Sequence, residues 1–342
     1  MATHLGLYFG HPSCLEHDPR VHMPEHPDTP ERLMAIEREL EAHDWLGWER
    51  RMAPSAGNAE LERVHSIRHI ERIRELSLVG GGAIDGDTFV GVPSFRAALH
   101  AAGGACAMTR ALMAGESTLG FVGVRPSGHH ATPDRAMGFC LFNNTAIAAA
   151  LAIDELGARR VLVLDWDVHH GNGTAEAFRR RSDVLFVSIH QSGIYPGTGL
   201  LSDVGSGPGL GYTINLPVPS GSESDLWLSL IEHIVLPAAT SFAPDLVLIS
   251  AGFDAHVADP LASCHLEASS FAHMTRHMRD FARERAIPLG AILEGGYAPD
   301  TLAECVRATL TALTDDLPAE SAAPEPSFTA RAAAHIANHW PL

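Results

Sequence analysis

The 342-residue sequence predicts an α/β protein in which a central, mostly parallel β-sheet is flanked by helices. Short apolar runs, typical of strands buried on both faces, alternate with helix-like segments from Leu5 to about Leu313. No linker rich in Ser, Gly or Pro divides this stretch. We therefore expect a single domain over residues 1–342, with a core of about 5–313 and a C-terminal tail of about 314–342.

The strands are expected where apolar residues follow one another without a polar break, as in Val161-Leu162-Val163-Leu164. Strands buried inside a parallel sheet have this continuous pattern instead of a polar–apolar alternation. The segments that qualify are residues 5–9, 119–124, 161–164, 184–189, 212–216, 246–249 and 289–293. A sheet of about eight strands is consistent with this set.

The helices are expected between these strands. Residues 29–42 form a helix with Thr29 as the N-cap and Pro30 at the first helical position. Residues 61–78 carry apolar side chains at helical spacing, which predicts one amphipathic helix. Two helices rich in small residues, 95–113 and 144–155, and a short one near the end of the chain, 328–338, complete the set.

The charge of the chain limits its partners. The formal net charge is −17, with 24 Lys and Arg against 41 Asp and Glu, so nucleic acid is not expected as a partner. The acidity is compatible with a cationic substrate, although its usual role is solubility. No uncharged apolar run approaches the ~18 residues of a membrane span, so no membrane partner is expected either.

The N-terminus and the cysteines favour the cytoplasm as the location. Residues 1–6 lack the basic and apolar regions of a secretory signal. The five cysteines are scattered, odd in number and form no C-x-x-C pair, as expected for reduced thiols.

Asp and His residues follow three predicted strands that are far apart in the sequence. They lie in residues 125–131, 165–173 and 251–254. Open parallel sheets place their active sites at the carboxyl ends of their strands, so these segments are expected to meet at one edge of the sheet. A metal-dependent hydrolase is therefore the first hypothesis.

A metal site is predicted from three of these residues. Asp167 and His169 are two apart after a strand, so both side chains point to one face if the backbone stays extended. With Asp254 they give three ligands and leave a position open, as in catalytic sites. Two carboxylates and an imidazole suit zinc, with Fe(II), Mn(II) or Co(II) as alternatives. Each Asp alone could equally be a helix cap or a loop hydrogen-bond acceptor.

The dipeptide His129-His130 has two interpretations. Adjacent histidines do not easily bind one ion together, but both can line a pocket as an acid–base pair for a hydrolase. The alternative is a pair of packed loop histidines.

The ordered motifs resemble a known superfamily. Five of them appear in sequence: Arg125-Pro-Ser-Gly-His-His-Ala131, Gly138-Phe-Cys-Leu-Phe-Asn-Asn144, Asp165-Trp-Asp-Val-His-His-Gly-Asn-Gly-Thr174, Ala251-Gly-Phe-Asp254 and Glu294-Gly-Gly-Tyr297. Together they resemble the metal-dependent histone deacetylase and acetylpolyamine amidohydrolase superfamily, whose fold is arginase-like. The resemblance covers residues 5–313, nearly the whole chain.

The resemblance implies a role for each motif. Asp167, His169 and Asp254 would be the zinc ligands, and Tyr297 would hold the substrate carbonyl by a hydrogen bond. His129 and His130 would be the acid–base pair, with His130 as the base that activates the water. Asp165 would orient His129. Asn172 occupies the position behind His130 where some relatives carry Asp, and the Asn form resembles the class II branch. An amide makes the imidazole less basic than a carboxylate would.

The resemblance also implies a potassium site and a substrate tunnel. Potassium would be bound by groups of Asp165, Asp167, His169, Ser188 and Ile189, although Ser188 could equally be an ordinary strand-end serine. Residues expected near the substrate are Gly138, Phe139, Leu261, Gly295 and Asp87, with Phe139 as a wall of the acyl-lysine tunnel.

The expected reaction is zinc-dependent removal of acetyl or other short acyl groups from lysine side chains. Leu261 stands where polyamine-specific relatives carry an acid, which favours acyl-lysine. An acid from Asp85 or Asp87 would instead favour the alternative, an acetylpolyamine amidohydrolase. A binuclear manganese ureohydrolase and a non-enzymatic binding module are more distant alternatives. The N-terminal loop with His11, His17, His22 and His26 either selects substrate and assists homo-oligomerisation or is an ordered polar loop.

Overall fold

The computed structural model describes residues 4–319, 321 and 327–341. Its centre is an eight-stranded sheet in the order β2-β1-β5-β10-β9-β6-β7-β8, and all neighbouring strands run parallel. The strands are β1 (Leu7–Gly10), β2 (Glu49–Met52), β5 (Leu119–Val122), β6 (Val161–Asp165), β7 (Val184–Gln191), β8 (Thr213–Val218), β9 (Leu246–Ala251) and β10 (Leu289–Leu293). This confirms the predicted α/β class and the sheet of about eight strands.

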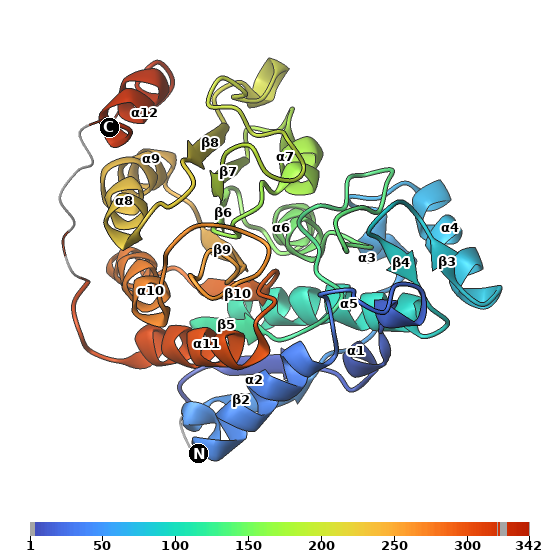
Figure 1. Cartoon of the computed structure of the whole chain (residues 1–342). Helices are drawn as coiled ribbons and strands as arrows, with labels where there is room; N and C mark the ends of the chain where they lie inside the picture. The colour runs from blue at the N-terminus through green and yellow to red at the C-terminus, as the bar shows by residue number, and fades with distance from the viewer. Residues whose placement is uncertain (1–3, 320, 322–326, 342) are drawn as a thin grey trace.

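Helices cover both faces of the sheet (Figure 1). On one side lie α8 (Ser224–Leu230), α9 (Leu236–Phe242), α10 (Ala268–Glu284) and α11 (Pro299–Thr314), and α2 (Glu31–Ala42) packs against α11. On the other side lie α5 (Ser94–Met113), α6 (Asn144–Asp154) and α7 (Asn172–Phe178). A π-helical turn, Ile231–Val235, joins α8 to α9.

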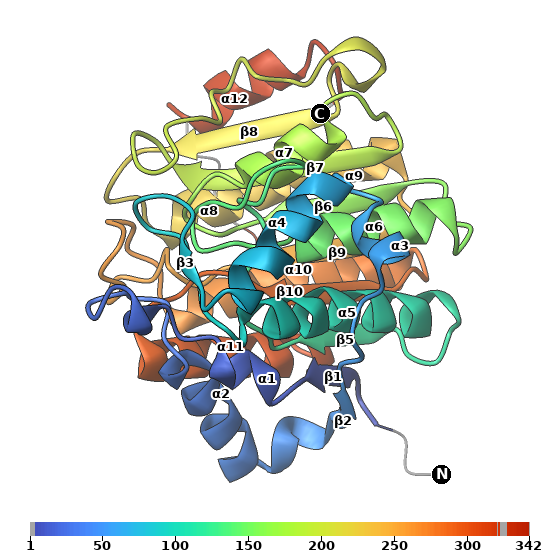
Figure 2. The ribbon, with the colours of Figure 1, turned by 90° about the vertical axis from the view of Figure 1, so that its right-hand side faces the viewer.

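Smaller elements surround this framework. Outside α5 and α6 lie α3 (Asn58–Leu61), α4 (Ile67–Leu78) and an antiparallel pair of short strands, β3 (Gly82–Ala83) and β4 (Phe89–Val90) (Figures 1 and 2). The helix α1 (Ser13–Glu16) packs on α5, and α12 (Thr329–Ile336) packs on the α8 region. Within the described residues, no helix is long and apolar enough to cross a membrane.

Three details differ from the sequence-based expectations. The edge strand β2 was not predicted, because Glu-Arg-Arg-Met has no apolar run. The helix expected over 61–78 is interrupted, and α4 begins after Ser66, whose side chain accepts a hydrogen bond from the His69 amide. The predicted Thr29 cap is wrong, since α2 begins at Glu31 and its N-cap, Pro30, provides no side-chain hydrogen bond.

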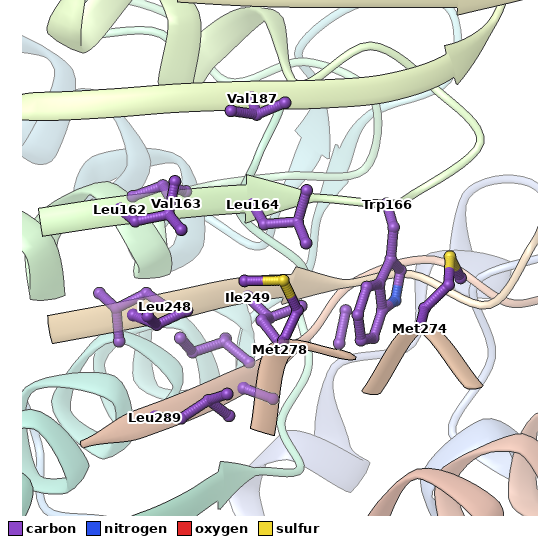
Figure 3. Packing of buried hydrophobic residues seen from close by; sticks show 14 of the residues in the cluster. Leu162, Val163, Leu164, Trp166, Val187, Leu248, Ile249, Met274, Met278 and Leu289 are labelled. Carbon is purple, nitrogen blue, oxygen red and sulfur yellow. The ribbon is translucent and has the colours of Figure 1, made fainter. Parts of the chain in front are cut away.

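The core side chains explain how the motif Asp165-Trp-Asp167 is oriented. Leu162, Leu164 and their neighbours on β7, β9 and β10 are fully buried, and Trp166 extends from the end of β6 toward Met274 and Met278 of α10 (Figure 3). In extended backbone, alternate side chains point to opposite sides. The anchored indole of Trp166 therefore turns the two flanking carboxylates, Asp165 and Asp167, away from α10.

Candidate active site and metal centre

The four central strands, β5, β10, β9 and β6, each end in one of the segments that the sequence singled out. Their carboxyl ends meet at one edge of the sheet, as parallel strands require. The loop after β5 carries His129 and His130, and the loop after β10 carries Tyr297. Asp254 follows β9, while Asp167 and His169 follow β6.

Asp167, His169 and Asp254 form a compact cluster. Nδ1 of His169 lies 3.2 Å from Oδ1 of Asp167 and 3.0 Å from Oδ2 of Asp254. One ligand atom from each residue lies within 4.8 Å of the others, and all three residues are buried. Among the described residues, one other group of this kind exists, His129, Cys140 and Glu294. Two buried carboxylates beside one imidazole are costly without a cation between them.

The backbone fixes the cluster from two sides. The amide of Gly295 donates to Oδ2 of Asp167 at 2.8 Å, and the amide of Val168 donates to Oδ1 of Asp254 at 2.8 Å. A side chain on Gly295 would collide with the carboxylates of Asp167 and Asp254, so this position requires glycine. Gly295, which we expected near the substrate, thus lies against these two carboxylates.

The two carboxylates of the cluster shift the pKa of His169. Burial alone would lower the pKa of His169, but the carboxylates of Asp254 and Asp167 outweigh it and raise the pKa to about 10. The cluster therefore attracts a positive charge, as expected for ligands that exchange protons for a metal.

The two histidines of the loop after β5 have different partners. Nδ1 of His129 is 3.0 Å from Oδ2 of Asp165, whereas Nδ1 of His130 is 2.8 Å from Oδ1 of Asn172. Their rings are 4.0 Å apart. Burial would lower both pKa values, but the carboxylates of Asp167 and Asp165 hold that of His129 well above its ordinary value. Burial and the adjacent imidazoles keep the pKa of His130 well below its ordinary value.

A cavity of about 220 Å³ opens above the cluster. Its walls are Asp87, His130, Gly138, Phe139, His169, Ile194, Tyr195, Leu261 and Tyr297. The ring of Phe139 stands edge-on to that of Tyr297, with centroids 5.6 Å apart, and Tyr195 stands edge-on to His130 at 5.0 Å. The cavity is thus a narrow aromatic passage that has His130 and His169 at its inner end.

The family model described as "Histone deacetylase domain" matches residues 26–313. The chain belongs to the histone deacetylase family. This confirms the resemblance that the motifs indicated.

Individual members of the histone deacetylase family show the extent of the similarity. The histone deacetylase-like amidohydrolase of Pseudomonas aeruginosa is 42% identical over 266 residues, which is 77% of this chain and 70% of that protein. A probable deacetylase of Archaeoglobus fulgidus is 38% identical over 86% of this chain and 81% of its own length. Histone deacetylase 15 of Arabidopsis thaliana is 38% identical over 86% of this chain, which spans about half of that plant protein, 53%. The crystal structure of the HDA15 HD domain superposes with a TM-score of 0.88 at 34% identity, covering 97% of this chain and 95% of that one.

Most residues that the motifs singled out come together in this member of the histone deacetylase family. Of the expected substrate residues, Asp87, Gly138, Phe139 and Leu261 line the cavity. Asp165 is fully buried beneath His129.

Of the residues expected to bind potassium, Asp165, Ser188 and Ile189 lie within strands of the sheet. Ser188 pairs with Asp165 across β6 and β7, and Ile189 follows it on β7. The hydroxyl of Ser188 lies 2.9 Å from Nδ1 of His190.

Several residues near the site were not assigned by the sequence analysis. Tyr195 and Ile194 line the cavity and lie in the loop after β7. Glu294 is fully buried, and its Oε2 accepts hydrogen bonds from the amides of Gly128 at 2.7 Å and His129 at 3.1 Å. The Glu-Gly-Gly-Tyr motif was the signal that could have identified Glu294. Its partner Gly128, however, lies 166 residues away in the sequence.

The N-terminal loop reaches the mouth of the cavity. Nε2 of His26 lies 2.9 Å from the carbonyl oxygen of Asp87, and its ring is 4.5 Å from that of Phe139. His26 and His17 are buried, while His22 is exposed and contacts the carbonyl of Val90. His26 thus contacts two residues of the cavity wall, Asp87 and Phe139, and belongs to an ordered part of the loop.

Proposed function

We propose that this protein is a zinc-dependent amidohydrolase that removes acetyl or other short acyl groups from lysine side chains. The observation that carries the proposal is the inner end of the cavity, where the cluster of Asp167, His169 and Asp254 lies beside His130 and Tyr297. Membership of the histone deacetylase family supports the same reaction. We propose the cytoplasm as its location.

The donor set fits a divalent cation. Two carboxylates and one imidazole suit Zn²⁺, with Fe²⁺, Mn²⁺ or Co²⁺ as alternatives because no thiolate belongs to the set. A bound cation would polarise the amide carbonyl and acidify the attacking water. Potassium, near Asp165 and Ser188, would have a structural role.

The side chains around the cavity divide the proton transfers between them. His130 stays neutral because its pKa is lowered, and its Nε2 can take the proton of the attacking water while Nδ1 is held by Asn172. The water oxygen bonds to the amide carbon. An imidazolium of the pair then gives a proton to the amine nitrogen as the C–N bond breaks, so that acetate and the free amine leave.

Tyr297 stabilises the negative charge that develops on the carbonyl oxygen. Burial raises the pKa of this phenol well above its ordinary value, so it remains a hydrogen-bond donor at neutral pH. Donors that are aimed at the developing charge in a site that excludes water are worth several kcal/mol, about 3–4 per donor in one well-studied protease.

The residues at the mouth of the cavity affect which substrate is preferred. Leu261 is an apolar wall residue, which suits the methylene chain of acyl-lysine. The alternative, an acetylpolyamine amidohydrolase, is favoured by Asp87, which also lines the cavity beside Asp85. Burial and the neighbouring Asp85 raise the pKa of Asp87.

Amine release from an acetyl-lysine peptide and from acetylputrescine, each with zinc-loaded protein, tests the proposal. Turnover of the peptide that a hydroxamate blocks would support a zinc lysine deacylase. Turnover of acetylputrescine alone would replace it with the polyamine alternative. Binding of both compounds without amine release would indicate a binding module. About one metal per chain would exclude the binuclear ureohydrolase.

A further inference from the structure

The loop that follows Asp254 contains a buried carboxylate with two backbone partners. Asp259 is 7% exposed. Its Oδ2 accepts a hydrogen bond from the amide of Tyr297 at 2.6 Å, and its Oδ1 accepts one from the amide of Leu261 at 2.9 Å. Both of these residues line the cavity. The Asp259 side chain therefore holds the backbone of two cavity residues, Tyr297 at the inner end and Leu261 at the mouth.

The peptide between Gly296 and Tyr297 is held at both of its polar groups. Its carbonyl accepts a hydrogen bond from Nε of Arg32 at 2.6 Å, and its N–H donates to Asp259. The guanidinium carbon of Arg32 lies 4.8 Å from the centre of the Tyr297 ring. Hydrogen bonds at both polar groups restrain the orientation of this peptide, and with it the backbone from which the Tyr297 side chain extends.

Burying an ionised carboxylate at position 259 is unfavourable in free energy. Burial, followed by the charge of Asp254, raises the pKa of Asp259 to about 7 in spite of the two amides that it binds. An asparagine of the same shape would avoid this cost, but it could accept only one of the two N–H groups and would turn its own NH₂ toward the other.

We infer that Asp259 is a positioning residue, which fixes the phenol of Tyr297 over the metal-ligand cluster and links it to the mouth of the cavity at Leu261. The kinetic part of this inference rests on the proposed function. The geometric part concerns the loop alone and can be tested in protein without metal or substrate.

Hydrogen–deuterium exchange of the metal-free full chain tests the geometric part. Asp259→Ala removes both acceptor oxygens and should speed exchange in the segments that contain the amides of Tyr297 and Leu261 by about tenfold or more. The matched control is Asp245→Ala, before β9 at the opposite edge of the sheet, where Oδ2 of Asp245 accepts from the amides of Arg159 at 2.8 Å and Arg160 at 3.1 Å. It should affect only residues 159–160. Unchanged exchange at Tyr297 in Asp259→Ala would overturn the inference.

A double-mutant cycle tests the kinetic part. In zinc-loaded protein, Asp259→Asn should lower kcat by roughly 10- to 100-fold with unchanged zinc content, because a small misplacement of a catalytic group has an effect of this size. In the Tyr297→Phe background it should lower the remaining kcat little further. An equal loss in both backgrounds would show a general structural effect and overturn the inference.

A variant that does not fold and a wild type without activity can each be told apart from a failure of the inference. Should Asp259→Ala or Asp259→Asn not fold, Asp259→Glu keeps the carboxylate and displaces its oxygens, and faster exchange with a lowered kcat is again expected. Should wild-type protein turn over no acyl-amide, the proposed function fails, while the exchange experiment still decides whether Asp259 holds Tyr297.

Discussion

Asn172 accepts a hydrogen bond from Nδ1 of His130 at 2.8 Å. The amide of Asn172 is oriented by two further contacts, since its Nδ2 lies 3.4 Å from the carbonyl of His130 and 3.5 Å from the sulfur of Met137. The arrangement fixes the proton of a neutral His130 on Nδ1 and leaves Nε2 as an acceptor. The neighbouring His129 has a carboxylate, Asp165, in the corresponding place. The carboxylate beside His129 favours its imidazolium more than the amide beside His130 does, so the two partners add to the difference in pKa between the histidines.

Replacing Asn172 by Asp should move the acidic limb of the pH–rate profile to higher pH. A carboxylate favours the imidazolium, so it raises the pKa of His130 by about one unit or more. A base must be neutral to act, and a higher pKa means that activity is lost at a higher pH as the solution is acidified. The measurement is kcat/KM of the wild type and of Asn172→Asp against pH. Coincident acidic limbs would contradict the role of His130 as the base.

Removing a ligand carboxylate should remove the metal and the activity together. Asp167→Ala or Asp254→Ala leaves two of the three donors, and we expect zinc content well below one per chain with kcat at background. Metal analysis and amine release on the same samples check this. The control is Asp245→Ala, whose carboxylate lies before β9 at the other edge of the sheet. Full zinc content in either ligand variant would contradict the assignment.

A carboxylate at the mouth should change the substrate preference. Leu261 is 37% exposed at the wall of the cavity, so Leu261→Glu places a charge where the chain of the substrate enters. We expect the ratio of kcat/KM for acetylputrescine to that for acetyl-lysine peptide to rise by about tenfold or more, through attraction of the ammonium group. Leu261→Gln has a similar shape without the charge and should change the ratio much less. An equal change in both variants would show that shape, not charge, is responsible.

His65 should make the protein less stable in acid. The ring is 2% exposed, with Nδ1 3.0 Å from the carbonyl of Thr132 and Nε2 accepting from the amide of Asn143 at 2.8 Å. Burial lowers its pKa to about 3, whereas a histidine in the unfolded chain has a pKa of ~6.5. Between these values the unfolded state binds a proton that the folded state does not. The stability from His65 is therefore complete above pH ~6.5 and declines as pH falls toward 3, by up to ~1.4 kcal/mol per pH unit.

The test for His65 compares the free energy of unfolding of the wild type and of His65→Gln between pH 4 and pH 8. The variant is expected to be less stable at neutral pH, yet its stability should fall less steeply in acid, because it lacks the titrating group. Parallel curves for the two proteins would show that His65 does not titrate on unfolding.

Local patterns predicted the elements that are buried on both faces. The runs that became β6 and β9 consist of Val, Leu and Ile with hardly a polar residue, and both strands are fully buried. The edge strand β2 has the opposite character, since its four residues are Glu, Arg, Arg and Met and none of them is buried. An edge strand forms because a neighbouring backbone offers hydrogen bonds, and this information is absent from its own residues.

The sequence by itself determined the fold class, the family and the grouping of Asp167, His169 and Asp254, because each motif follows a buried strand and parallel strands end at one edge. The tertiary structure decided which distant groups hold those residues in place. Arg32 contacts the carbonyl of Gly296 across 264 residues, and Asp259 contacts the amide of Tyr297 across 38. The position of Tyr195 in the cavity wall was likewise decided by the path of the loop after β7. Such contacts depend on how loops fold over a completed sheet, and no spacing or periodicity in the chain encodes them.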